Sequence, residues 1–236
     1  SLRFAVVGGE PMPIELIKTW QSKGVPIRQG FGLTEFGPNV FSLGEEDSIR
    51  KAGSIGFPNF YIETRIVDDD GQDVVSGEIG ELLLRGPVCT PGYWNNQEAT
   101  AAAIKNGWLH TGDAMRQDDD GYYYVVDRIK DIYISGGENV SPAEVENVLA
   151  GHPDVHELAI VGIPHDKWGE VPIAFVVRRP GATVSEDGLI AFSRERLAHF
   201  KCPRKVVFCT LPKTSTGKIQ KFVLRAQVKS ASAIDA

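Results

Sequence analysis

The chain has 236 residues, of which 42% are hydrophobic, and its 31 acidic and 25 basic side chains leave a net charge of −6. This composition is typical of a soluble globular protein with one or two domains. It excludes a bilayer span, since no apolar run approaches the roughly 20 residues required, and no signal segment is present.

Cysteine usage and the first residues place further limits. The three cysteines show no C-x-x-C spacing, which argues against a disulfide framework or a zinc site and favours a reducing cytoplasm. The chain has no initiator Met and begins on an apolar run. We therefore expect it to be a fragment of a longer protein.

Residues 1–49 are typical of the end of an open parallel α/β sheet. Two predicted strands, RFAVV and VPIRQ, flank a predicted helix at residues 14–23. The first strand ends at Gly8 and Gly9, and the second at the glycines of GFGLTE. Ligands bind at the carboxyl ends of parallel strands, and glycine lets the backbone approach them closely. We expect both turns to open onto one ligand crevice.

Residues 50–129 are predicted to be all-β with one inserted helix. YIETRIV, GEIGELLLRG and YYYVVDR are predicted strands, and NNQEATAAAIKNG is a predicted helix that ends at Gly107. The sequence DDDG occurs twice, at residues 68–71 and 118–121. It lacks the D-x-D-x-D-G spacing of a calcium loop, so both copies are predicted hairpin turns.

Residues 130–236 predict a small α+β domain. A helix is expected from Pro142 to Gly151, followed by the strands ELAIVGI, IAFVVR and KVVFC, with a second helix from Ser185 to about His199. Residues 201–230 hold eight basic side chains and no acidic one. They form either a solvated basic face or a local field for a small polyanion such as a nucleotide or coenzyme A. No aromatic platform accompanies them, so nucleic acid is disfavoured.

The stretch LPKTSTGKIQK, residues 211–221, contains a Gly-Lys pair like that of a phosphate loop. The phosphate-loop pattern G-x-x-x-x-G-K-[ST] needs glycine where Pro212 stands and Ser or Thr where Ile219 stands. Lys218 is therefore not a phosphate-loop lysine.

Five segments in register resemble the later motifs of the adenylate-forming superfamily, which includes acyl-CoA synthetases, peptide-synthetase adenylation domains and firefly luciferase. The segments are GFGLTE (30–35), GELLLRGPVCTPGYW (80–94), GWLHTGD (107–113), YYYVVDRIKDIYISGGENVSPAEVE (122–146) and LPKTSTGKIQK. ISGGENVSPAEVE and KWGE are most similar to bacterial ligases for fatty or aromatic acids. The family's own phosphate loop lies upstream of these motifs, so the resemblance implies that the chain is roughly the second half of a full enzyme. It would contain the end of the large domain, a β-barrel-like subdomain at 50–129, the hinge and the small C-terminal domain.

The resemblance implies a nucleotide site in the first half of the chain. Phe31 matches the aromatic that stacks on adenine, and Gly32 lets the base approach the backbone. Thr34 matches the hydroxyl that binds the α-phosphate. Glu35 matches the Mg²⁺ ligand, and one carboxylate suffices because Mg²⁺ also takes substrate oxygens.

The resemblance also assigns two residues to the ribose side of the nucleotide. Asp113 matches the carboxylate that binds the ribose hydroxyls, and Arg128 matches a contact to the same nucleotide. The plain alternatives are a turn cap for Asp113 and an ion pair with Asp131 for Arg128. Lys130 falls at the family's domain hinge, where the alternative is an exposed linker lysine.

Coenzyme A residues are implied in the second half. Gly136 and Gly137 match the loop that lines the pantetheine tunnel, and Trp168 matches a tunnel wall, with a core tryptophan as the alternative. Phe200 stands where some ligases stack the CoA adenine. The neighbouring arginine of those ligases is replaced by Cys202, which departs from the pattern.

Lys218 matches the catalytic lysine that bridges the carboxylate and the α-phosphate. A lysine on a rotating domain can stabilise this step and then withdraw. The implied activity is an AMP-forming acid–thiol ligase that uses ATP/AMP, Mg²⁺ and coenzyme A on a carboxylic acid. The fragment alone is expected to be inactive, and a homodimer is one assembly open to the full-length protein.

The nature of the acid and the class of protein stay open at this point. Phe36, Val40 and Phe41 lie near the expected acyl site and favour a fatty acid, with an aromatic acid as the alternative. Other readings are an adenylation domain that loads a carrier protein and a non-catalytic nucleotide-binding module.

Overall fold

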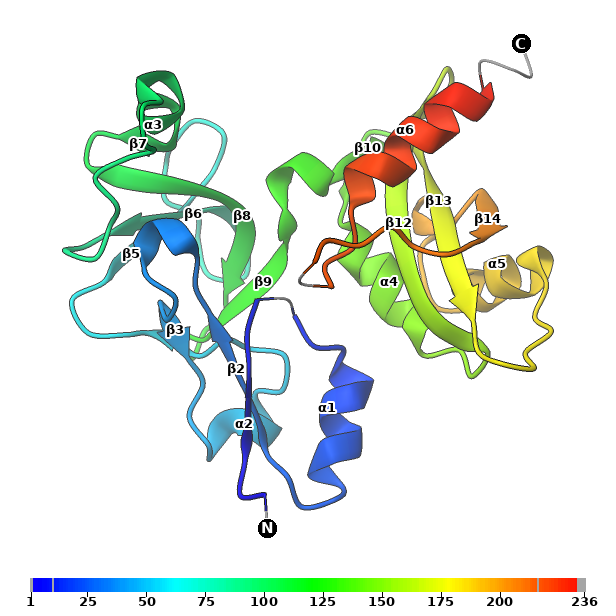
Figure 1. Ribbon diagram of the computed structural model, residues 1–236, viewed down its shortest axis with the longest axis horizontal. Coiled ribbons are helices and arrows are strands. Elements are labelled where there is room, and N and C mark those ends of the chain that lie inside the picture. Colours follow the sequence, from blue (N-terminus) through cyan, green and yellow to red (C-terminus); the bar gives the residue numbers. More distant parts are fainter. Residues whose placement is uncertain (1, 10, 216, 233–236) are drawn as a thin grey trace. The chain divides into compact units, whose positions relative to one another are not determined.

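The computed structural model describes residues 2–9, 11–215 and 217–232. The chain divides into two compact units, Ser1–Ile129 and Lys130–Ala236 (Figure 1). Each unit has buried hydrophobic clusters of its own. No helix in the described part of the chain combines the length and apolar character that a membrane span requires.

The first sheet of unit 1 is parallel only at its start. β1 (Ala5–Val7) runs parallel to β2 (Ile27–Phe31), and α1 (Ile14–Gln21) connects them. β3 (Phe41–Ser42) and β4 (Phe57–Pro58) continue the sheet in antiparallel order. β2 runs two residues beyond the predicted strand because Gly30 and Phe31 pair with β3.

The second sheet of unit 1 is antiparallel, as the strand pattern predicted. Its strands are β5 (Glu63–Val67), β6 (Ile79–Arg85), β7 (Ile104–Lys105), β8 (Trp108–Gln117) and β9 (Tyr123–Arg128), in the order β5-β6-β8-β7 with β9 also paired to β8. Both DDDG sequences are turns. Gly71 N–H donates to the Asp68 carbonyl at 3.0 Å, and Gly121 N–H donates to the Asp118 carbonyl at 2.8 Å.

The inserted helix α3 (Gln97–Ala103) is shorter than predicted. The Asn96 side chain caps it by accepting a bond from Ala99 N–H at 3.0 Å. Its predicted end at Gly107 is wrong, because Ile104 and Lys105 leave the helix and pair with β8. Asn106 and Gly107 have φ angles of 51° and 79°, as a two-residue hairpin turn requires.

One hydrophobic core joins the two sheets of unit 1. Its buried members come from the segment after β2 and from the strands of the second sheet: Phe36, Val40, Phe41, Ile55, Ile66, Leu82, Leu84, Leu109, Met115 and Tyr123. The Phe41 and Tyr123 rings are 4.8 Å apart between centroids. The short 3₁₀ helix η1 (Thr34–Phe36) is thereby fixed to the second sheet.

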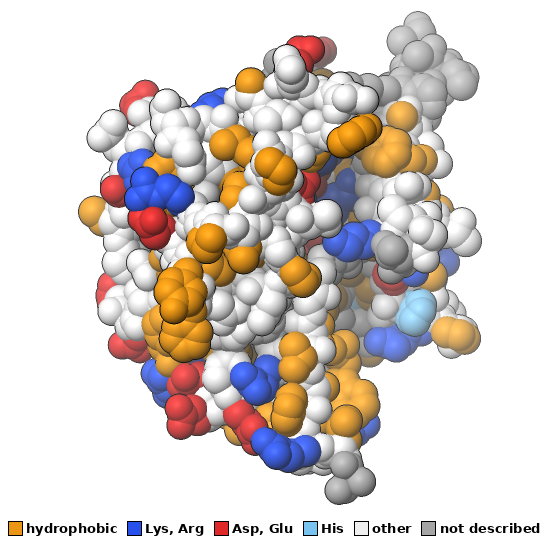
Figure 2. Space-filling model, turned by 60° about the vertical axis from the view of Figure 1, so that its left-hand side comes forward, with side chains coloured by type: hydrophobic (Ala, Val, Ile, Leu, Met, Phe, Trp, Pro, Cys, Tyr) orange, Lys and Arg blue, Asp and Glu red, His pale blue; other side chains and the backbone are white. Residues whose placement is uncertain are grey.

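Charges of both signs alternate on the surface of unit 1. Figure 2 shows acidic and basic side chains side by side on the face that it displays. Arg85 pairs with Glu63, and Lys51 Nζ lies 2.7 Å from carboxylate oxygens of both Asp118 and Asp120. The hydrogen bonds that Lys51 donates to Asp118, and secondly to Asp120, raise the pKa of Lys51. The Lys51 ammonium thus joins the segment after α2 (Asp47–Arg50) to the β8–β9 turn.

In its described residues, unit 2 contains a five-stranded sheet and three α-helices. The strands are β10 (Tyr133–Ser135), β11 (Glu138–Val140), β12 (Val155–His165), β13 (Gly169–Arg178) and β14 (Lys205–Phe208), in the order β11-β10-β13-β12, and β14 runs parallel to β13. The helices are α4 (Pro142–Ala150), α5 (Glu186–Arg194) and α6 (Lys221–Ser232). The sequence did not predict the β10–β11 hairpin or α6.

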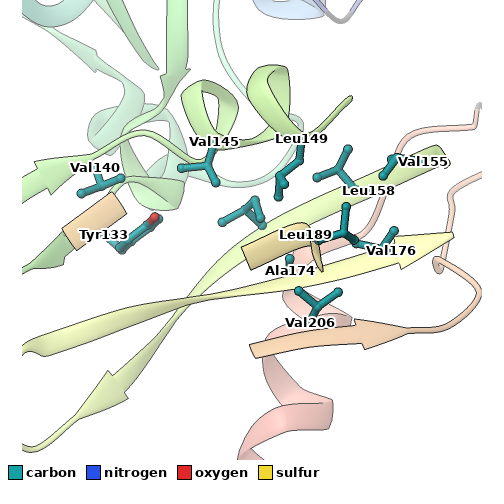
Figure 3. Close-up of a cluster of buried hydrophobic side chains, with 11 residues drawn as sticks. Tyr133, Val140, Val145, Leu149, Val155, Leu158, Ala174, Val176, Leu189 and Val206 are labelled. Carbon is teal, nitrogen blue, oxygen red and sulfur yellow. The ribbon is translucent and has the colours of Figure 1, made fainter. Parts of the chain in front are cut away.

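Both faces of β12 and β13 are buried. Leu158, Ile160, Ala174 and Val176 point toward α4 and α5, where Val145, Leu149 and Leu189 meet them (Figure 3). The alternate residues Ala159, Val161, Ile173 and Phe175 pack with Leu224 of α6. Successive side chains of a strand point to opposite faces, so a sheet covered on both sides needs the nearly continuous apolar runs seen in the sequence.

Helix α5 begins as predicted but ends earlier. The Ser185 side chain caps it by accepting from Gly188 N–H at 3.1 Å. The expected extension to His199 is wrong. The N–H groups of Arg196 and Leu197 both bond to the Ser193 carbonyl, and Ala198 then takes an extended ψ of 142° before the 3₁₀ turn η3 (His199–Lys201).

Tyr133 offers a test of the unit 2 core. Its side chain is 1% exposed, and among the described residues its hydroxyl has no hydrogen-bond partner. A buried hydroxyl without a partner costs about 1–3 kcal/mol. We expect Tyr133→Phe to raise the free energy of unfolding by about 1 kcal/mol, measured by urea denaturation.

A matched control is Tyr123→Phe in unit 1. The Tyr123 hydroxyl lies 2.9 Å from Thr64 Oγ1 and its side chain is 7% exposed, so this variant is expected to lose stability. A loss of stability in Tyr133→Phe would mean that a bound water satisfies the Tyr133 hydroxyl.

Candidate functional site

The ends of β1 and β2 lie side by side at their glycines. A Cβ atom placed on Gly8 would lie 3.6 Å from the Gly30 carbonyl oxygen, and Gly9 has a φ of 93°. Gln29, only 4% exposed, holds the loop after β1 because its side-chain oxygen accepts from Met12 N–H at 2.7 Å. Nothing in the sequence except its place in a predicted strand indicates that Gln29 holds this loop.

The segment after β2 turns sharply into η1. A Cβ atom on Gly32 would lie 2.2 Å from the Pro38 carbonyl oxygen, so no side chain fits there. Thr34 is exposed and Glu35 is half-buried. The Glu35 carbonyl accepts from Thr90 N–H at 2.7 Å, which ties η1 to the loop after β6. Phe31 packs edge-on against Phe41, with ring centroids 5.9 Å apart.

Tyr93, a residue that the sequence motifs contain but did not single out, contacts the Glu35 side chain. Its hydroxyl donates to Glu35 Oε1 at 2.9 Å, and this bond raises the pKa of Tyr93. One half-buried carboxylate held in this way, beside the exposed Thr34 hydroxyl, suits a hard cation that draws its other ligands from substrate oxygens and water. Glu35 therefore fits a role in holding Mg²⁺.

The expectation that Phe36, Val40 and Phe41 indicate the acyl chain is wrong. Their side chains are at most 1% exposed and belong to the core of unit 1. Their apolar character is accounted for by packing, so it carries no information on the substrate.

Asp113 and Arg128 form an ion pair across neighbouring strands. They are register partners in β8 and β9, and Arg128 Nε lies 3.0 Å from Asp113 Oδ1. The Asp113 side chain is 9% exposed and that of Arg128 is 52% exposed. Arg128 also donates to the Thr111 carbonyl at 3.0 Å. The structure therefore holds a largely buried carboxylate beside an accessible guanidinium.

The alternative ion pair of Arg128 with Asp131 does not occur. Asp131 instead accepts from Arg225 of α6 at 2.6 Å. Lys130 is exposed and lies in the 3₁₀ turn η2 (Ile129–Asp131), where the two units join in the chain.

In unit 2, Gly136 and Gly137 form the two-residue turn of the β10–β11 hairpin. Their φ angles are 64° and 90°, which a two-residue hairpin turn of this type requires. A Cβ atom on Gly136 would lie 3.7 Å from Trp168 and 4.0 Å from Phe200. The hairpin turn, Trp168 and Phe200 are therefore neighbours.

A pocket of about 280 Å³ lies beside this turn. Its lining residues are Ser135, Trp168, Val171, Pro172, His199, Phe200, Cys202 and Arg204. Trp168 is 37% exposed, so the core-tryptophan alternative is wrong. Cys202 occupies the position of the missing arginine, and Arg204 is another lining residue of the same pocket.

Lys218 lies near the end of a small loop that closes on itself. Lys213 and Ile219 pair as an isolated β-bridge, and Thr214 N–H donates to the Lys218 carbonyl at 2.8 Å. Lys218 N–H returns a bond to Thr214 Oγ1 at 3.1 Å. Ile219 packs against the α6 side of the core, whereas the Lys218 side chain is exposed. Thr216 lies outside the described residues.

Among the described side chains of the segment 201–230, four basic residues have acidic partners within unit 2. The pairs are Lys201–Glu144, Lys213–Glu157, Lys221–Glu146 and Arg225–Asp131. Acidic side chains therefore neutralise part of this basic segment. It is neither an entirely solvated basic face nor a continuous positive field for a polyanion. Arg204 and Lys218 are among the cations left to act on a ligand.

Comparison with known proteins identifies the family of this chain. The family model described as "AMP-binding enzyme" matches residues 1–94, and "AMP-binding enzyme C-terminal domain" matches residues 144–218. A feruloyl-CoA synthase from Amycolatopsis sp. is 44% identical over 226 residues. The chain belongs to the AMP-binding enzyme family. It covers 46% of that relative's length, and 95% of the chain is aligned.

Other AMP-binding enzymes have comparable sequence identity to this chain. The long-chain-fatty-acid–CoA ligase FadD13 of Mycobacterium tuberculosis is 44% identical, with 96% of this chain and 45% of the ligase aligned. The o-succinylbenzoate CoA synthetase of Bacillus subtilis, solved with its acyl-adenylate intermediate, has a TM-score of 0.87 at 40% identity, over 96% of this chain and 46% of that one. The same synthetase solved with ATP and a magnesium ion has a TM-score of 0.86 at 39% identity, with the same coverage.

The tight turn at Gly32 generates a stability prediction. An added methyl group would press on the Pro38 carbonyl, and overpacking of this kind costs about 1–3 kcal/mol. We expect Gly32→Ala to lower the free energy of unfolding of unit 1 by that amount, measured by urea denaturation. The control is Gly44→Ala, whose Cβ would have its nearest contact at 3.5 Å. Equal stability of the two variants would contradict the steric account.

Proposed function

We propose that the full-length protein is an AMP-forming acid–CoA ligase. In the first half-reaction a carboxylate oxygen attacks the α-phosphorus of ATP, pyrophosphate leaves and acyl-AMP forms. In the second, the CoA thiolate attacks the acyl carbon, and AMP leaves as the thioester forms. Residues 1–129 are proposed as the end of the large AMP-binding domain, with the β-barrel-like subdomain at 50–129, and residues 130–236 as the small C-terminal domain.

The observation that carries this proposal is the division of the proposed site residues between two compact units of one chain. Unit 1 holds the Asp113–Arg128 pair and η1, and unit 2 presents Lys218 on an exposed loop. A cation on a separate unit can approach the reacting anions for one step and leave for the next. Lys130, at the junction of the units, is the proposed hinge.

Unit 1 is proposed to bind the nucleotide. Phe31 and Gly32 would receive the adenine, Thr34 the α-phosphate, and Asp113 with Arg128 the ribose side. Gly9 would line the same crevice from the end of β1. Glu35 would hold Mg²⁺, which when bound supplies positive charge to the phosphate oxygens.

Unit 2 is proposed to bind coenzyme A. The hairpin turn Gly136–Gly137 and Trp168 border the pocket, whose ring of Phe200 can accept an adenine by stacking. The Arg204 guanidinium can pair with a phosphate. In the proposed site, Arg204 would supply the positive charge that some ligases of the family carry on an arginine at the position of Cys202.

The acid is proposed to be an acyl or aryl carboxylic acid. The printed names of the relatives include feruloyl-CoA synthase, long-chain-fatty-acid–CoA ligase and 2-succinylbenzoate–CoA ligase. They support both the fatty acid that we expected and the aromatic alternative. Acid-dependent ATP–pyrophosphate exchange by the full-length protein, measured over a panel of fatty and aromatic acids, separates the two.

The role of Lys218 gives the sharpest test. We expect Lys218→Ala to slow ATP–pyrophosphate exchange by about 100-fold or more, because one donor aimed at transition-state charge is worth that much. Thiolysis of supplied acyl-AMP should change only a few-fold, since the lysine has withdrawn by then. Single-turnover assays of the two half-reactions measure both effects.

The matched control is Lys213→Ala in the same loop, because Lys213 already pairs with Glu157. It should leave both half-reactions nearly unchanged. Equal loss of the two half-reactions in Lys218→Ala would overturn the assigned role. Transfer to a carrier protein with no saturation by CoA would instead favour an adenylation domain.

A further inference from the structure

Strand β8 departs from regular pairing immediately before Asp113. Opposite β6, Leu83 pairs with His110 and Glu81 pairs with Ala114. One residue of β6 therefore faces three residues of β8, namely Thr111, Gly112 and Asp113. A bulge of this kind bends the strand and re-aims its side chains. The bulge is what sets the direction of the Asp113 side chain.

The Glu81 carboxylate spans this bulge from the neighbouring strand. Its Oε1 accepts from Gly112 N–H at 3.0 Å, and its Oε2 lies 2.7 Å from His110 Nδ1. Gly112 has a φ of 68°, so its N–H points away from the regular ladder and needs a partner of this type. Hydrogen bonds to an ionised carboxylate are stronger than neutral ones.

Two further contacts fix the other residues of the bulge. Thr111 Oγ1 donates to the Leu82 carbonyl at 2.8 Å and accepts from Asp113 N–H at 3.1 Å. On the opposite side, Arg128 binds the Thr111 carbonyl and the Asp113 carboxylate. The backbone around Asp113 is therefore held from β6 and from β9.

The strands themselves do not need this carboxylate in order to associate. Leu82, Leu84 and Leu109 are at most 1% exposed and already bury the β6–β8 interface. The side chains of Glu81 and His110, by contrast, are 21% and 27% exposed. The contacts of Glu81 with His110 and Gly112, at the edge of this apolar interface, therefore orient the backbone of the bulge and bury little surface. We call these contacts the clamp.

We propose that Glu81 and His110 are positioning residues that hold the bulge and thereby aim Asp113 at the ribose hydroxyls. The inference rests on the proposed nucleotide role of Asp113. Its consequence is specific: loss of the clamp weakens recognition of the ribose hydroxyls and leaves recognition of the base and phosphate in place.

The test compares AMP with 2′,3′-dideoxy-AMP as ligands of the full-length protein by calorimetry. Asp113→Ala should bring the two affinities close together. Glu81→Ala should reduce the preference for AMP by about tenfold while the dideoxy ligand binds within a few-fold of its original affinity. Glu81→Gln, which keeps an acceptor for Gly112 N–H, should retain more of the preference, and His110→Ala should lose part of it.

Two controls make the result decisive. Glu63→Ala removes another inter-strand pair, Glu63–Arg85, and should leave the preference unchanged. The double variant Glu81→Ala/Asp113→Ala should lose no more preference than Asp113→Ala alone, since coupled residues are not additive.

The outcomes separate this inference from the proposed function. If Asp113→Ala removes the preference but both Glu81 variants keep it, the positioning role is wrong and the nucleotide role stands. Equal weakening of both ligands by Glu81→Ala and Glu81→Gln would also overturn the positioning role, as a purely structural effect. If Asp113→Ala itself leaves the preference intact, the ribose contact fails, and the inference fails with it.

Discussion

The apolar character of both faces of β12 and β13 constrains the whole of unit 2. A sheet with two apolar faces must be covered twice, and α4 with α5 covers only one side. Helix α6 covers the other through Leu224 (Figure 1). The loop before α6 is drawn against the same cluster by Leu211 and Ile219. The loop that carries Lys218 is therefore held in place by hydrophobic burial of neighbouring side chains and by its own backbone hydrogen bonds.

The same helix ties the start of unit 2 to the rest of that unit. Lys221 and Arg225 stand one helical turn apart on α6 and reach Glu146 of α4 and Asp131. The Glu146 carboxylate also accepts from Ile160 N–H of β12 at 2.7 Å. Asp131 is thereby tied to unit 2 by a pair whose side chains are 27% and 14% exposed. Unit 2 begins one residue earlier, at Lys130.

Periodicity and turn chemistry in the sequence predicted β5, β6 and β9 of the second sheet and β12 to β14, and the resemblance of five motifs indicated the family. They failed where tertiary pairing decided the outcome. Ile104 and Lys105 have helical neighbours, yet the Asn106–Gly107 turn pairs them with β8. Phe36, Val40 and Phe41 are apolar because they pack in the core of unit 1. The sequence alone cannot distinguish a core residue from one that lines a pocket. Contacts such as Tyr93 with Glu35 and Glu81 with Gly112 join residues 58 and 31 positions apart, and local pattern carries no signal for them.

Glycines near a proposed ligand site differ in what requires them. Gly9 and Gly137 have φ angles of 93° and 90°, so the backbone alone demands glycine at both positions. Gly32 is required by the Pro38 carbonyl that a Cβ would meet at 2.2 Å. Gly8 has neither reason: its φ is outside the left-handed region, and an added Cβ would make an ordinary 3.6 Å contact with Gly30. The packing of the described residues would therefore accept alanine at Gly8, in contrast to the other three glycines.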